Sequence, residues 1–183
     1  MKSATLGTVL TVAATLALTA PIAPAAHADA GSPVLIASCT GTLNGTYTKP
    51  LDPGSTNAQQ ADSLTQNGTV TCVDDGGQPL VRGTVTRSVT LPAAQCSGIA
   101  YSDPSATRIT WADGTFTALT LDQANVVSVL GTASTTGAGS VSADSTKFTG
   151  DSIDGAVMSS GPGCGTAPGQ TNVSSTLVFT LAH

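Results

Sequence analysis

The sequence predicts an all-β domain, and we expect an antiparallel β-sandwich, immunoglobulin-like or related, with a small β-barrel as the alternative. Runs rich in Thr and Val alternate polar and apolar residues with the period of two that strands show. Turn signals recur roughly every 8 to 12 residues and delimit about eight to ten short strands. Apolar residues spaced for an amphipathic helix are missing, apart from one short helical turn expected near residues 121–125.

Residues 1–28 have the features of a secretory signal peptide. Lys2 supplies one positive charge before the apolar stretch 4–20, and small residues at 26 and 28 precede Asp29. We expect cleavage after Ala28 and secretion to the extracellular space. The remaining residues, 29–183, are enough for one hydrophobic core and too few for two. The apolar stretch is marginal for a membrane span.

A lipid anchor on Cys39 is the alternative to free secretion. Ile36-Ala37-Ser38-Cys39 matches the short pattern that precedes a lipidated cysteine. The pattern should directly follow the apolar region of the signal, but Asp29, Gly31 and Pro33 lie between them. We therefore expect the free, secreted form.

Composition excludes several classes of function. The chain has six Lys and Arg, eleven acidic residues that are all Asp, and a net charge of −5, which disfavours binding to nucleic acid. Its only histidines are His27, in the signal, and His183, at an end expected to fray. Because a Ser-His-Asp site and tuned glutamates are thus out of reach, we expect no enzyme and no cofactor.

Four cysteines lie in the exported part, where an oxidising compartment favours two disulfides. Three pairings are open. We prefer Cys39–Cys72, whose members lie in adjacent predicted strands, together with Cys96–Cys164. A metal site is not expected, because no CxxC spacing occurs.

Individual strands follow from their turn residues. Gly-Thr pairs mark strands near residues 41, 45, 68 and 83, and Asn-Gly at 44–45 and 67–68 could be a turn or a bulge. The clearest hairpin joins 108–112 to 115–119 through Asp113-Gly114, a type I′ signal. The last strand, 173–181, has Val173, Ser175, Leu177, Phe179 and Leu181 on one face. Segments 52–61 and 160–171, rich in Gly, Pro and Ser, are predicted loops.

Arg87 is the unusual residue of its strand. It shares a face with Val85 and Val89, where an apolar residue is expected. It could protect a sheet edge from association or pair with a partly buried Asp. The functional interpretation is a ligand pocket in which Arg87 fixes a carboxylate or sulfate.

Other candidates are aromatic or acidic. Trp111 and Asp113, with Tyr101 beside them, could form a sugar-stacking surface, although alternation with Ile109 favours a core position for Trp111. The Asp clusters at 74–75 and at 151 and 154 could hold Ca²⁺, but turn formation explains them better, and Asp151 and Asp154 should face opposite ways.

Two resemblances follow from these motifs. The signal ending at 26–28, the opening Ser38-Cys39-Thr40-Gly41-Thr42 and the run Arg82-Gly83-Thr84-Val85-Thr86 resemble a family of secreted, β-rich actinobacterial proteins with no assigned function. In size, export and two-disulfide β character the chain is also similar to the actinobacterial apoproteins that sequester enediyne chromophores in an immunoglobulin-like sandwich. The second resemblance implies a carrier role.

The expected function is a secreted, non-catalytic binding or cell-surface module. Its partner is open and could be a small molecule or a cell-surface component. Two alternatives differ in structure. A small-molecule carrier would have an apolar cavity with Arg87 at its mouth. A protease inhibitor would need a rigid exposed loop, for which 160–171 around Cys164 is the candidate.

Overall fold

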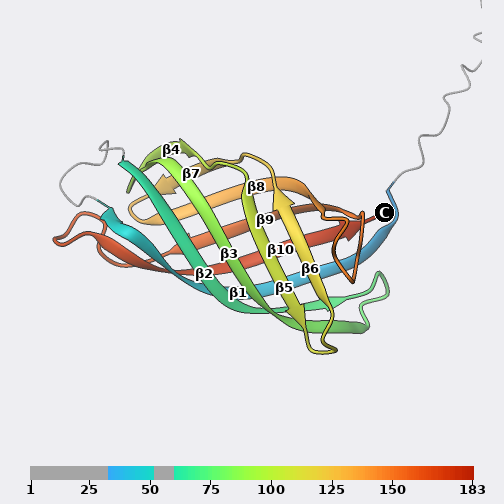
Figure 1. Cartoon of the computed structure of the whole chain (residues 1–183). Coiled ribbons are helices and arrows are strands. Elements are labelled where there is room, and N and C mark those ends of the chain that lie inside the picture. The colour runs from blue at the N-terminus through green and yellow to red at the C-terminus, as the bar shows by residue number, and fades with distance from the viewer. Residues whose placement is uncertain (1–32, 52–59) are drawn as a thin grey trace, which may run out of the picture. The chain divides into compact units, whose positions relative to one another are not determined.

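The computed structural model describes residues 33–51 and 60–183, which contain ten strands and no helix, as the all-β prediction required (Figure 1). The signal peptide and most of the predicted loop 52–61 lie outside the described residues. Pro33–His183 forms one compact unit. The strands are β1 (Leu35–Leu51), β2 (Gln60–Val73), β3 (Pro79–Ala94), β4 (Gly98–Tyr101), β5 (Ser105–Trp111), β6 (Phe116–Leu121), β7 (Asn125–Val129), β8 (Thr132–Val141), β9 (Ser152–Ser160) and β10 (Gln170–Ala182).

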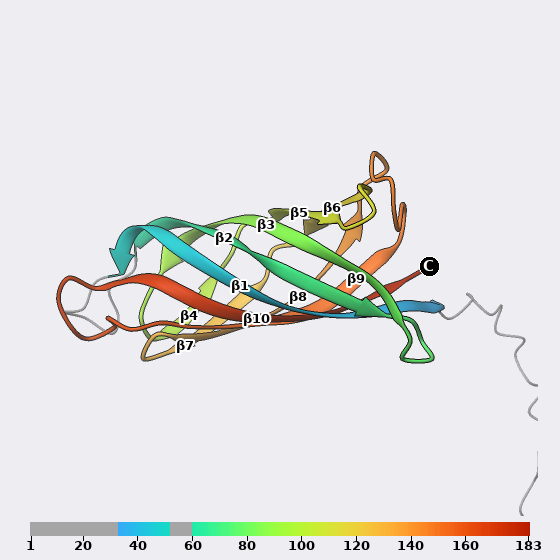
Figure 2. The same cartoon turned by 90° about the horizontal axis from the view of Figure 1, so that it is seen from below.

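The sheet closes on itself, so the fold is a barrel, which was the alternative to the expected sandwich. Antiparallel pairing runs in the order β8-β6-β5-β3-β2-β1-β10-β9, and β9 pairs again with β8 to complete eight strands. Figure 2 shows these strands lengthwise, from below. Closure leaves no free edge among the eight strands, whereas two packed sheets would keep four.

Glycines let the long strands bend around the ring. Both Asn-Gly pairs lie inside strands, β1 and β2, and neither forms a turn. A Cβ on Gly68 would lie 1.9 Å from the carbonyl oxygen of Thr42, and one on Gly41 would lie 2.6 Å from that of Thr69. Since only glycine allows so close an approach, the backbones of β1 and β2 can come this near at these two positions.

Alternation along the strands fills the interior with apolar side chains. The last strand behaves as predicted, because Val173, Ser175, Leu177, Phe179 and Leu181 are all buried. The core divides into two clusters. One contains Trp111 and Phe179, and the other contains Tyr47 and Leu64.

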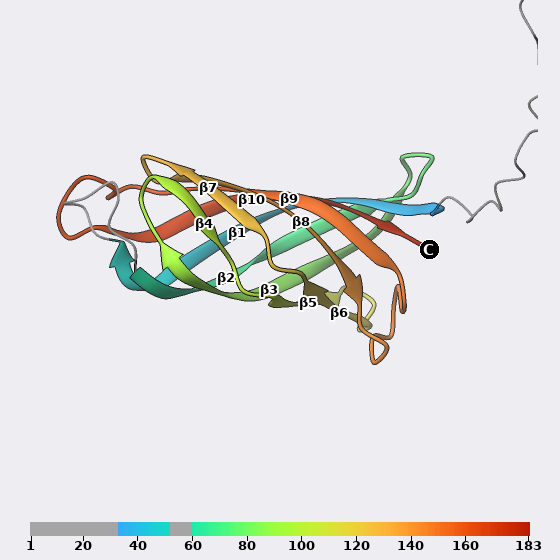
Figure 3. The ribbon, with the colours of Figure 1, turned by 90° about the horizontal axis from the view of Figure 1, so that it is seen from above.

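The strands β4 and β7 lie outside the ring and continue the wall at one end. One edge of β8 pairs with β7 through Thr132–Thr135 and with β6 through Gly139–Val141. Figure 3 shows β4 and β7 toward one end and β5 and β6 toward the other. The segment 122–124 that joins β6 to β7 is irregular, so the expected helical turn near 121–125 is absent.

The predicted hairpin at Asp113-Gly114 is present with a different turn. The nitrogen of Trp111 donates to the oxygen of Thr115, which leaves three residues in the loop. Gly114 has φ of +83°, and Asp113 is not among the positive-φ residues. A three-residue loop with glycine in the left-handed region therefore replaces the two-residue type I′ turn.

The two disulfides join the pairs that the sequence favoured. Cys39–Cys72 crosses from β1 to β2 with a Cα–Cα distance of 4.0 Å, and Cys96–Cys164 links the β3–β4 and β9–β10 connections. Because the sulfur of Cys39 is bonded to Cys72, it offers no thiol for a lipid anchor. Two disulfides are consistent with an oxidising compartment. His183 does not fray, since its backbone exchanges two hydrogen bonds with Val34.

Candidate ligand site in the barrel interior

Arg87 points into the barrel, with 9% of its surface exposed, between the inward-facing Val85 and Val89. Neither structural explanation of this residue holds. Its strand, β3, is paired on both sides, by β2 and β5, and is not an edge. The ion pairs among residues 33–51 and 60–183 are Lys147–Asp113 and His183–Asp151, so Arg87 has no carboxylate partner there.

A chain of hydrogen bonds runs from Arg87 across the interior. The Nη1 of Arg87 donates to Oε1 of Gln66 at 3.0 Å, and Nε2 of Gln66 donates to Oγ of Ser175 at 2.7 Å. The hydroxyl of Ser159 lies 2.7 Å from that of Ser175. We call Gln66, Arg87, Ser159 and Ser175 the polar layer. It fixes the amide of Gln66 with its oxygen toward the guanidinium.

The polar layer lies between the two apolar clusters. On β2 Gln66 stands between Leu64 of one cluster and Val70 of the other, and on β10 Ser175 stands between Val173 and Leu177 in the same way. Gln66 and Ser175 therefore lie at the same level of the interior, between the two apolar clusters.

A cavity of about 40 Å³ adjoins Arg87 on one side of the layer. Ser105 and Thr107 form part of its polar wall, and the apolar wall includes Leu119, Ile153, Val157, Leu177 and Phe179. A smaller cavity of about 30 Å³ adjoins Arg87 on the side of Leu64 and Val89. Both volumes exceed what a single water molecule needs.

Two buried polar atoms beside the larger cavity have no hydrogen-bond partner. They are Nε of Arg87 and Oγ1 of Thr107, and these residues face each other across β3 and β5. Burial lowers the pKa of Arg87. An arginine starts from a pKa above 12, so the side chain stays charged at neutral pH. The cavity wall therefore presents an uncompensated positive charge and a hydroxyl.

The larger cavity reaches the surface where the wall changes strands. Asp122, Ala124 and Gly137 line it at the junction between β6 and β7, and Asp122 is exposed. Beside this opening, Ser102 exchanges hydrogen bonds with the backbone of Ala124, at 2.9 and 3.2 Å. The cavity mouth is thus lateral, through the wall.

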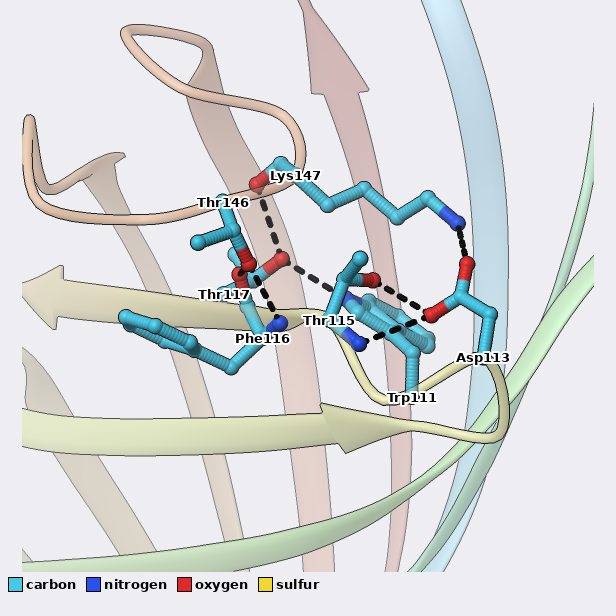
Figure 4. A network of polar contacts seen from close by, with 7 residues as sticks. All are labelled: Trp111, Asp113, Thr115, Phe116, Thr117, Thr146 and Lys147. Atoms are coloured by element: carbon cyan, nitrogen blue, oxygen red, sulfur yellow. Dashed lines mark hydrogen bonds and ion pairs between the residues drawn. The ribbon is translucent and has the colours of Figure 1, made fainter.

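Trp111 and Asp113 do not join Arg87. Trp111 is buried and donates from Nε1 to Oγ1 of Thr117 at 2.8 Å (Figure 4). Its ring meets that of Phe148 edge-on, with ring centroids 5.8 Å apart. Asp113 lies in the exposed turn. Hydrogen bonds from Lys147 and then Thr115 hold its pKa well below the usual range. Of the three candidate ligand residues, Arg87 alone lines the cavity.

The Asp clusters serve other roles. Asp74 closes the β2–β3 turn through its carboxylate and the nitrogen of Gln78. Asp151 is buried against Nδ1 of His183 at 3.0 Å, whereas Asp154 is exposed, as strand spacing predicted. Within the described ranges, no group of three or more potential metal ligands comes together. In the same part of the chain, no helix is long and apolar enough to cross a membrane.

The fold and site together define an eight-stranded antiparallel barrel with a charged polar layer beside an internal cavity. Comparison with protein-family models, curated protein sequences and solved structures finds no match for this chain. Arguments about function therefore rest on the geometry of the site.

Proposed function

We propose that the chain is a secreted, non-catalytic protein that carries a small molecule inside its barrel. The observation that supports this proposal is the unpaired guanidinium of Arg87 at an internal cavity. Eight-stranded barrels have interiors wide enough to be filled by side chains or to hold one small ligand.

Stability alone does not account for Arg87. Burying a charge costs several kcal/mol, and a partner or ligand must offset that cost. Gln66 provides one neutral hydrogen bond and no opposite charge. A barrel selected only for stability would have an apolar residue here, as at Val85 and Val89. A bound molecule that faces the guanidinium supplies the missing compensation.

Export supports the carrier proposal from the sequence side. The signal features of residues 1–28 and the two disulfides favour a protein that works outside the cell. The protease-inhibitor alternative depends on the β9–β10 connection, where Gly163, Gly165 and Gly169 have positive φ. Such glycine content leaves a recognition loop poorly preorganised.

Native mass spectrometry of the protein from its producer's culture medium tests the proposal. We expect an N-terminus at Asp29 and an extra mass that denaturation releases while both disulfides stay intact. Arg87→Met should come from the same medium without that mass, and Arg108→Met, which removes an exposed arginine, should keep it. Wild-type protein that never carries a cargo would contradict the carrier role and favour a surface module.

A further inference from the structure

We infer that the ligand is a small monoanion, a carboxylate with a short apolar substituent, bound between Nε of Arg87 and the hydroxyl of Thr107. This inference rests on the proposed carrier function and specifies its ligand. The two atoms are the unpartnered polar groups beside the larger cavity, and they belong to directly opposed residues of β3 and β5.

The geometry of Arg87 leaves one side of its guanidinium for a ligand. Gln66 accepts from Nη1, and Ser175 in turn holds the amide of Gln66. The Nε–H has no partner within the protein. A carboxylate can accept from Nε with one oxygen and from a hydroxyl with the other, and charge-assisted bonds of this type are the strong ones.

The charge of the site favours a single negative charge. Lys49, Arg82 and Arg108 are exposed, and Lys147 is paired with Asp113. Among the residues that line the two cavities next to Arg87, Arg87 is the only cation. The acidic group that lines the larger cavity is Asp122, at the exposed mouth. A dianion would bring a second charge into the interior with nothing to offset it.

The buried Asp62 forms no ion pair with Arg87, and its Oδ2 has no hydrogen-bond partner. It lies on the same face of β2 as Gln66, but its Oδ1 accepts from the backbone nitrogens of Lys49 and Ser63. It lines neither cavity. The positive charge therefore remains available to a ligand in the cavity.

The rest of the cavity sets the size and polarity of the substituent. Beyond Thr107 and Ser105 the wall is formed by side chains such as Leu119, Leu177 and Phe179, which offer no hydrogen bonds. A volume of about 40 Å³ excludes a long acyl chain and limits the substituent to a short one. Gly137, near the mouth, leaves space that a side chain would fill. A Cβ added at this position would have Cβ of Ala124, 3.6 Å away, as its nearest neighbour.

Calorimetric titration of the secreted, disulfide-intact protein, freed of any cargo, tests the ligand class. The probes are butanoate, its neutral analogue butanamide, the cation butylammonium and the dianion sulfate. We expect butanoate to bind and the others to bind at least about tenfold more weakly, because charge-assisted hydrogen bonds dominate the site.

Two variants with one control locate the binding. Arg87→Met should weaken butanoate binding by about ten- to hundredfold, and Thr107→Val, which keeps the shape and removes the hydroxyl, by about two- to tenfold. Arg108→Met should leave binding unchanged. Thermal unfolding of each variant checks the fold, and Thr107→Val provides the test if Arg87→Met does not fold.

The outcomes separate the ligand class from the carrier function. Butanamide or sulfate binding as tightly as butanoate would overturn the monocarboxylate assignment. The same conclusion follows if no probe binds while protein from the medium still carries a cargo, and the carrier function then stands. If no probe binds and no cargo is found, both the inference and the proposed function fail.

Discussion

Replacing the polar layer with apolar residues should stabilise the ligand-free barrel. Arg87→Met alone removes an unpaired buried charge but leaves Oε1 of Gln66 without its 3.0 Å donor. An orphaned buried acceptor costs about 1–3 kcal/mol, which offsets part of the gain. Adding Gln66→Leu removes that acceptor, and Ser175 keeps its contact with Ser159. Apolar replacement of buried charged groups often stabilises by about 1–4 kcal/mol, the range we expect for the double variant.

Denaturant unfolding of the ligand-free protein with intact disulfides measures this difference. The double variant should have the highest midpoint. The changes in the free energy of unfolding caused by Arg87→Met and by Gln66→Leu alone should not add up to that of the double variant, because the two side chains share a hydrogen bond. A double variant less stable than wild type by more than about 1 kcal/mol would refute the reasoning, since it would mean that the native protein already compensates the guanidinium. A saturating ligand should reverse the order, because it stabilises only the protein that binds it.

Two further predictions concern the barrel itself. Burial, and then the charge of Asp62, raises the pKa of Tyr47 to about 12. The stability that the neutral Tyr47 side chain contributes is therefore fully present below pH 10. The free energy of unfolding should fall by about 2–3 kcal/mol as the pH rises from 10 to 12. Denaturant unfolding at each pH should show this fall in Tyr101→Phe but not in Tyr47→Phe. Gly68→Ala places a Cβ 1.9 Å from a backbone oxygen and should lower the free energy of unfolding by about 3 kcal/mol or more. In the control Gly76→Ala, where the nearest atom lies 3.4 Å from the new Cβ, the free energy of unfolding should change by no more than about 0.5 kcal/mol.

Strand periodicity predicts the all-β class and the inward residues, but it cannot distinguish a barrel from a sandwich. Alternation shows which face of a strand is buried and leaves open which strands are neighbours. The strand that closes the ring, β8, illustrates the difficulty. Its inward positions are Ala133, Thr135, Gly137, Gly139 and Val141, so the middle of the strand has no apolar residue that would mark the inward face. Closure is decided by its pairing with β9, a long-range contact that the local sequence does not encode.

The sequence identifies only part of the candidate site, because local patterns do not show which residues of different strands come together. Arg87 stands out in the sequence because it interrupts an apolar face, and the same rule identifies Gln66 between Leu64 and Val70. Thr107 had no such signal, because threonine is common on both faces of these strands. Trp111 and Asp113 are close in sequence but do not form one surface, because Trp111 is buried and Asp113 lies in the exposed turn.

The polar layer also bears on how the strands find their partners during folding. A slip of one residue exposes the apolar face of a strand, but a slip of two preserves the alternation and is hard to reject on hydrophobic grounds. In this barrel, a two-residue slip of β3 against β2 would place Arg87 opposite Leu64 or Gly68, so the guanidinium would lose its hydrogen bond to Oε1 of Gln66. The buried charge that lowers the stability of the native barrel therefore destabilises a register shifted by two residues even more, although apolar packing alone would not distinguish the two registers.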